Sequence, residues 1–168
     1  QTSVIFHANM LYDDFDIAQY HVKILAHIMG QMPRVCRSRT DEIDVNPTGD
    51  DWSASPGEMT IDMGALDQEA LDGTLEESMM HECVHTSLDE DFEDDRAWHK
   101  AQRADRAFIS DYAEENPASE DLAETITLYL GLLFHPERFD DELTETIRDT
   151  VPNRLKYLER NLPKRALR

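Results

Sequence analysis

His81-Glu82-Cys83-Val84-His85 lies at the centre of the stretch that decides the fold, because that stretch predicts a largely buried helix. On a helical wheel at about 100° per residue, apolar side chains cover most of the circumference and the polar ones share one sector. The apolar set is Leu75, Met79, Met80, Cys83, Val84 and Leu88, and the polar set is Ser78, His81, Glu82, His85 and Asp89. Gly73 and the capping box of Thr74 and Glu77 mark the start of the helix. We therefore expect a core helix over about residues 74–88.

The two histidines of this stretch are spaced to bind one metal ion. Residues four apart on a helix have Cβ atoms about 5–6 Å apart, so His81 and His85 can both reach one tetrahedral Zn²⁺. Two imidazoles and a carboxylate on a buried helix are costly unless a partner satisfies them, and a metal ion does so directly. Glu82 then lies beside the metal as a base for water. Histidines on a solvated surface are the alternative interpretation.

A third ligand is expected from a helix further along the chain. Asn116, Pro117 and an acidic first turn predict a helix start, and the helix runs over about residues 119–134. Glu120 and Glu124 lie one turn apart on it. Beside a zinc ion, one carboxylate can bind the metal while the other orients a histidine ligand through its second ring nitrogen. The alternative is a solvated face that carries both glutamates.

The combination of these residues resembles the gluzincin metallopeptidases, whose third zinc ligand is a glutamate on a later helix. The run Phe108-Ile109-Ser110-Asp111-Tyr112-Ala113, with Asn116-Pro117 and Glu120-Asp121-Leu122-Ala123-Glu124 after it, is similar to the lethal-factor-like and Pro-Pro endopeptidase branch. The pattern is also similar to small uncharacterised bacterial zincin-like proteins. The resemblance covers about fifty residues, from Thr74 to Glu124.

By position, the resemblance implies a role for each residue of the site. Glu120 becomes the third ligand, Glu124 and Asp89 become carboxylates that support the ligands, and Tyr112 becomes the phenol that stabilises an oxyanion. Two departures from the branch bear on these roles. Tyr112 stands one residue farther from Glu120, which leaves Glu124 open as the ligand, and Leu122 replaces the usual aromatic residue.

The resemblance also implies a function, which is zinc-dependent hydrolysis of peptide bonds with one catalytic Zn²⁺ and with Glu82 as the general base. The substrate is then a peptide or a protein. The alternative is a zincin-like zinc protein without general protease activity that acts through a specific partner. A carboxylate-bridged di-iron site is a third class, but it requires a second Glu-x-x-His pair, which the sequence lacks.

Composition limits the range of partners. The net charge is −20 over 168 residues, and it is concentrated in residues 41–150, which sum to −26. Such a charge disfavours nucleic acid and anionic membranes. No apolar run is long enough for membrane insertion. The chain begins at Gln1 without an initiator Met or an apolar signal segment, so we expect a mature or trimmed form, which would suit an extracytoplasmic or secreted location. The oligomeric state stays open.

Cys36 and Cys83 are the two cysteines of the chain. The helical wheel turns Cys83 away from the histidines, which disfavours a ligand role. A disulfide between the helix and an upstream strand is one possibility in an oxidising compartment, and two buried thiols are the other.

The remaining pattern predicts an α+β fold, a compact zincin-like single domain over residues 1–168. Expected strands are residues 4–7, 34–39, 42–46 and 58–63, with a loop at 47–57. Expected helices are residues 16–29, 74–88, 95–110, 119–134 and 140–160. A small mixed sheet with the N-terminal helix is followed by the active-site helix and a helical C-terminal half. Glu58–Met63 is the candidate for an edge strand that pairs with substrate.

Overall fold

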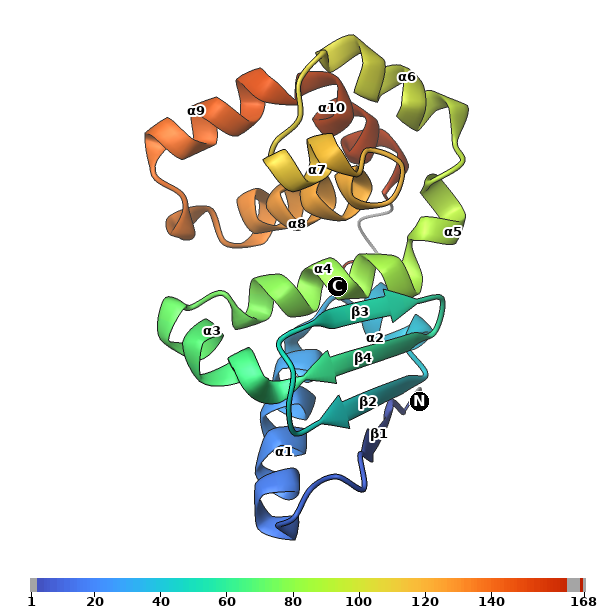
Figure 1. Cartoon of the computed structure of the whole chain (residues 1–168). Coiled ribbons are helices and arrows are strands. Elements are labelled where there is room, and N and C mark those ends of the chain that lie inside the picture. The colour runs from blue at the N-terminus through green and yellow to red at the C-terminus, as the bar shows by residue number, and fades with distance from the viewer. Residues whose placement is uncertain (1–2, 163–166, 168) are drawn as a thin grey trace. The chain divides into compact units, whose positions relative to one another are not determined.

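Four short segments build a mixed sheet near the N-terminus, and helices form the C-terminal half, so the fold is α+β (Figure 1). A computed structural model describes residues 3–162 and residue 167, without the side chains of residues 65, 67 and 68. The described residues form two compact units. The first contains residues 3–87 with residue 167, and the second contains residues 88–162.

The sheet belongs to the first unit and has the strand order β1-β2-β4-β3. Strands β1 (Ile5–Ala8), β2 (Glu42–Asn46) and β4 (Glu58–Asp62) are parallel, and β3 (Trp52–Ser55) is antiparallel to β4. One face of the sheet is buried through Ile43, Val45, Met59 and Ile61. In β2 and β4 these residues alternate with polar ones, which is the two-residue period of a half-buried strand. The strands predicted at 4–7, 42–46 and 58–63 are confirmed, and the first of them is held by its pairing with β2.

The position of the edge strand differs from the prediction. The segment predicted as a loop, residues 47–57, contains β3, which turns back at Gly57 with a φ of +84° and pairs with β4. Strand β4 therefore has a neighbour on each side, and the prediction that Glu58–Met63 lies at the edge is wrong. Strand β3 ends the sheet instead. Trp-Ser-Ala-Ser alternates over only four residues within a stretch rich in Pro, Gly, Asp and Ser, which is too short to stand out from a loop.

Two helices precede the second strand. Helix α1 (Phe15–Gln31) confirms the helix predicted over residues 16–29, and Asp14 caps it by accepting a hydrogen bond from the Asp16 amide at 2.8 Å. Helix α2 (Arg34–Arg39) was expected as a strand, and that prediction is wrong. Its buried residues, Val35 and Cys36, are adjacent, which suits one face of a short helix better than the alternating faces of a strand.

Helix α4 (Leu75–Ser87) is the predicted core helix. It follows the short segments η1 (Met63–Ala65) and α3 (Leu66–Asp72), and all six residues of its predicted apolar set are buried. A disulfide joins Cys83 of α4 to Cys36 of α2, with the two Cα atoms 5.5 Å apart. The cysteines therefore form a disulfide rather than two buried thiols. The bond joins α4 to a second helix, where the sequence predicted a strand.

The second unit consists of helices. They are α5 (Asp89–Phe92), α6 (Arg96–Asp105), α7 (Asp111–Glu115), α8 (Glu120–Phe134), η2 (Pro136–Arg138), α9 (Asp141–Thr150) and α10 (Pro152–Asn161). The helix predicted over 140–160 is divided, because the residue before Pro152 is disfavoured in the α conformation. The helix predicted over 95–110 ends early, where Arg106 takes a φ of +59°.

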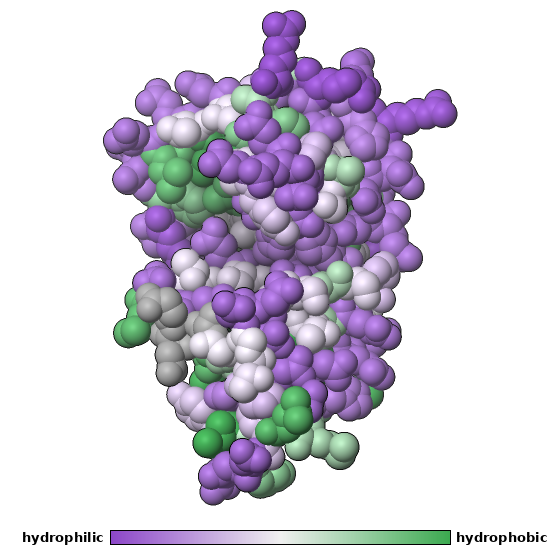
Figure 2. Space-filling model, viewed as in Figure 1, coloured by the Kyte–Doolittle hydropathy of each residue, from purple (hydrophilic) through white to green (hydrophobic). Residues whose placement is uncertain are grey.

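The surface agrees with the high charge of the sequence. Hydrophilic side chains cover much of the visible surface in Figure 2, and apolar side chains are exposed there in several groups, the largest at the upper left. None of the helices in the described part of the chain is long and apolar enough to cross a membrane.

Replacing both cysteines by alanine tests how far the disulfide stabilises the first unit. The bond joins residues 47 positions apart, and a loop of that length restricts the unfolded chain by about 4 kcal/mol. We expect the free energy of unfolding to fall by about that amount in urea titrations without reductant. A fall of less than about 1 kcal/mol would show that the bond contributes little.

Candidate metal centre

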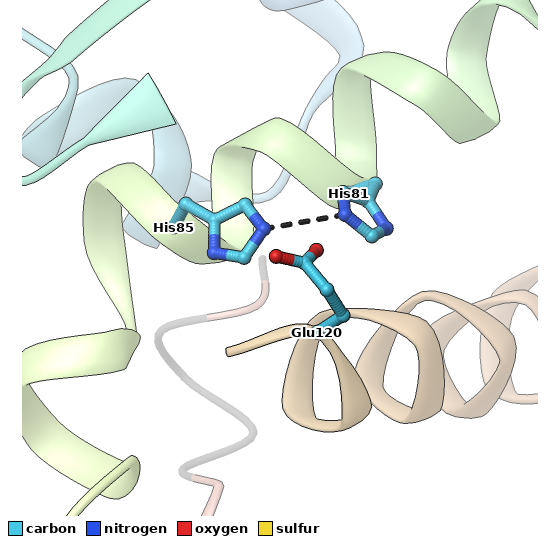
Figure 3. A group of neighbouring side chains, drawn as sticks. All are labelled: His81, His85 and Glu120. Atoms are coloured by element: carbon cyan, nitrogen blue, oxygen red, sulfur yellow. Dashed lines mark hydrogen bonds between the residues drawn. The ribbon is translucent and has the colours of Figure 1, made fainter. Parts of the chain in front are cut away.

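His81 and His85 lie on the same side of α4, as the four-residue spacing predicts. Their Nε2 atoms are 3.2 Å apart, and the ring centroids are 5.0 Å apart. Figure 3 shows both rings extending from the same side of the helix, with the contact between their nitrogens marked. Both side chains are half-buried. The rest of the helix is held in the core by Met79, Cys83 and Val84, so the histidines have little freedom to turn away.

The separation of the two ring nitrogens suits a shared zinc ion. Two nitrogens bound to zinc at about 2.0–2.1 Å, at the tetrahedral angle, lie about 3.3 Å apart. The observed separation of the Nε2 atoms is 3.2 Å. The separation of the two imidazole nitrogens is therefore the one that two positions of a tetrahedral ion require.

Glu82 follows the first histidine and is only 8% exposed. It lies between a half-buried histidine and the fully buried Cys83. A carboxylate next to two imidazoles that could bind a metal ion is chemically suited to accept a proton from water. The catalytic role of Glu82 stays a prediction.

Glu120 is the first residue of α8 and is half-buried. Its amide donates a hydrogen bond of 2.9 Å to the carbonyl oxygen of Asn116. Asn116 ends α7 and Ser119 stands at the N-cap position of α8, so the prediction that Asn116 caps this helix is wrong. Figure 3 shows the Glu120 side chain on the first turn of α8.

Among the described residues, one group of histidine, cysteine and acidic side chains could hold a metal ion, and it is His81, His85 and Glu120. Each of the three offers one ligand atom, and all three are half-buried. Two imidazole nitrogens with one carboxylate oxygen form a donor set typical of catalytic zinc sites, which leave one position open for water.

The other predicted site residues lie outside this group. Glu124 is half-buried one turn after Glu120 on α8, and Asp89 is the first residue of α5. Tyr112 lies on α7, and its side chain is 51% exposed. The roles that the resemblance implies for these three residues stay predictions.

A buried charged cluster in the second unit was not anticipated from the sequence. Arg154 of α10 forms ion pairs with Asp105 and Asp121, and all three side chains are fully buried. The Arg154 Nε donates to Asp105 Oδ2 at 3.0 Å, and its remaining nitrogens bond Asp121 and the carbonyl oxygen of Ala107. No sequence spacing marks this cluster, because its members are 33 and 49 residues apart.

The cluster bears on the candidate site because Asp121 directly follows Glu120. Besides Arg154, Asp121 accepts a hydrogen bond of 2.9 Å from Gln102. Burial raises the pKa of the Asp121 carboxyl, and the charge of Arg154 and the bond from Gln102 offset part of that rise. These contacts fix the first turn of α8, which carries Glu120, to α6 and α10.

Comparison of the chain with family models, curated protein sequences and solved structures gives no match. The gluzincin likeness therefore rests on the residues themselves.

Arg154→Met tests the buried cluster. The substitution leaves two buried carboxylates without their cation, so we expect the second unit to lose about 3–5 kcal/mol of stability. Thermal unfolding followed by circular dichroism measures the loss. Arg160→Met is the matched control, because Arg160 is exposed on the same helix. Equal losses in the two variants would contradict a special role for the cluster.

Proposed function

We propose that the chain is a zinc-dependent peptidase of the zincin type, with His81, His85 and Glu120 as the zinc ligands. The observation that carries the proposal is the pair of Nε2 atoms 3.2 Å apart on a buried helix, with Glu82 beside it. Glu120 supports it, because this carboxylate completes a group that could hold a metal ion. Two neutral imidazoles and one carboxylate contribute a charge of −1, so a Zn²⁺ ion with these ligands would keep a net charge of +1. A positive net charge allows the ion to act as a Lewis acid.

The proposed reaction is hydrolysis of a peptide bond. A zinc ion held by His81, His85 and Glu120 would lower the pKa of water to about 7 and would polarise the scissile carbonyl. Glu82 accepts the proton of the attacking water on its carboxylate and returns it to the leaving nitrogen. Its place beside His81 and its shielding from solvent are suited to this task.

Three further residues have proposed supporting roles. Glu124 and Asp89 accept hydrogen bonds from the second ring nitrogens of the histidine ligands, which fixes the tautomer of each ring. Tyr112 donates its phenolic hydrogen to the oxyanion of the transition state. These roles follow from the gluzincin resemblance and from the chemistry of the side chains.

An extended peptide is the proposed substrate, and β3 is the strand on which it would pair. Strand β3 ends the sheet and packs beside α4 (Figure 1). Its backbone can therefore add one more strand in the manner of other edge strands that bind peptides. We also propose that the whole chain acts as one domain, because the ligands come from both compact units and a shared zinc ion would join them.

Cleavage of a diverse peptide library tests the proposed function. We expect zinc-loaded wild-type protein to cut peptides and Glu82→Gln to retain one zinc per chain without cutting, since the amide cannot accept the proton. Metal content is measured by mass spectrometry on both proteins. A wild type that binds zinc through the histidines and cuts no peptide would instead support a zinc protein that acts on one specific partner.

The identity of the third ligand is tested by comparing two glutamine substitutions. Removing a residue that only supports a ligand weakens metal binding by about 10- to 100-fold, and removing a ligand itself weakens it further. We therefore expect Glu120→Gln to raise the zinc dissociation constant more than Glu124→Gln does. The constants are obtained by competition with a chromophoric chelator, and the reverse order would assign the ligand to Glu124.

A further inference from the structure

The turn of α4 that carries His85 is tethered to residues around the end of α2 and to the turn after β3. The disulfide holds Cys83, which lies two residues from each histidine. Next along the helix, the hydroxyls of Thr86 and Thr40 are hydrogen-bonded at 2.8 Å in a buried position. Both sulfur-bearing residues are fully buried. The disulfide therefore holds the side of the helix opposite the histidines, and the Thr40–Thr86 bond holds the residue next to His85.

The last carbonyl oxygens of α4 are also satisfied from outside the helix. Helix ends ordinarily leave their final carbonyls without a partner inside the helix. Here the Gly57 amide donates a hydrogen bond of 3.1 Å to the backbone carbonyl oxygen of Thr86. Arg39 Nη1 donates one of 2.6 Å to the backbone carbonyl oxygen of Ser87. The C-terminal turn is thereby prevented from fraying. We call the disulfide, the Thr40–Thr86 pair and the Arg39–Ser87 bond the α2 clamp.

The clamp has a consequence for metal binding because His85 lies between Cys83 and Thr86. Two ligands can share one ion only while their nitrogens stay near the 3.2 Å separation of the structure. A frayed turn would move His85 relative to His81 and would have to be ordered again when the ion binds. A site that is already ordered avoids this cost and binds its ligand more tightly.

We propose that the α2 clamp positions the His81–His85 pair for zinc, so that zinc affinity depends on residues that do not bind the metal. The inference rests on the proposed function, since it concerns the same site. Cys36, Cys83, Thr40 and Thr86 are positioning residues in this account. The disulfide acts as a permanent brace, because both of its residues are shielded from solvent and from reductants.

The test measures zinc affinity in clamp variants of the full chain, at a temperature where each variant is folded. We expect the double variant of Cys36→Ala and Cys83→Ala to bind zinc about 10- to 100-fold more weakly, as residues that orient ligands typically do. Thr86→Val removes one hydroxyl of the clamp and leaves the disulfide, and we expect binding to weaken about 10-fold. Thr86→Ser keeps the hydroxyl, so it should bind as wild type does.

Two controls separate positioning from general stability. Val45→Ala removes buried atoms from β2 of the same unit and leaves every residue of the clamp in place. We expect it to lower the unfolding midpoint while zinc affinity stays within about twofold of wild type. The visible spectrum of bound Co²⁺ gives a second readout, since its bands should change in Thr86→Val and remain unchanged in Val45→Ala.

The possible outcomes lead to distinct conclusions. Wild-type affinity in Thr86→Val and in the cysteine double variant would overturn the inference and leave the proposed function intact. An equal weakening in Val45→Ala would overturn it as well, because affinity would then follow stability alone. Wild-type protein that binds no zinc, or that binds it equally after His81→Ala, would overturn the proposed function and this inference together. If the double cysteine variant does not fold, the comparison of Thr86→Val with Thr86→Ser decides.

Discussion

The rest of the first unit depends on one constraint. Helix α4 lies in the core and yet carries the polar residues His81, Glu82 and His85, and removing polar side chains from water costs free energy. Helix α4 is buried along Met79, Cys83 and Val84, so its polar side chains cannot all be solvated. An ordinary core helix would carry apolar residues there. The 3.2 Å between the two ring nitrogens matches the requirement of one zinc ion, so a metal ion is a partner that suits these histidines.

Each unit fixes its own part of the candidate site by a different kind of interaction. The first unit uses a covalent bond and hydrogen bonds between α2 and α4. The second unit uses the buried pairing of Arg154 with Asp105 and Asp121, beside Glu120. A buried ion pair adds little net stability compared with apolar packing, but it allows few other arrangements of its members. Both kinds of interaction restrict the movement of the helix turns that carry the candidate ligands. A site that holds an ion in one geometry requires such rigid ligands.

The parts of the fold that follow from local pattern could be predicted from the sequence. These parts are the apolar stripe of α4, the alternation in β2 and the proximity of His81 to His85. Each depends only on residues that lie within a few positions of one another in the sequence. Interactions between distant residues could not be predicted in this way. The partners of Arg154 and the antiparallel return of β3 depend on contacts across long separations. Helix α2 was mistaken for a strand because six residues contain too few periods to distinguish the two.

The most direct test of the central claim is a crystal structure of the zinc-loaded protein with anomalous scattering data collected at the zinc edge. We expect one strong anomalous peak per chain, with His81 Nε2, His85 Nε2 and a carboxylate oxygen of Glu120 each about 2.0–2.2 Å from it. A peak bound by the histidines without Glu120, or no peak near α4, would show that the proposed ligand set is wrong.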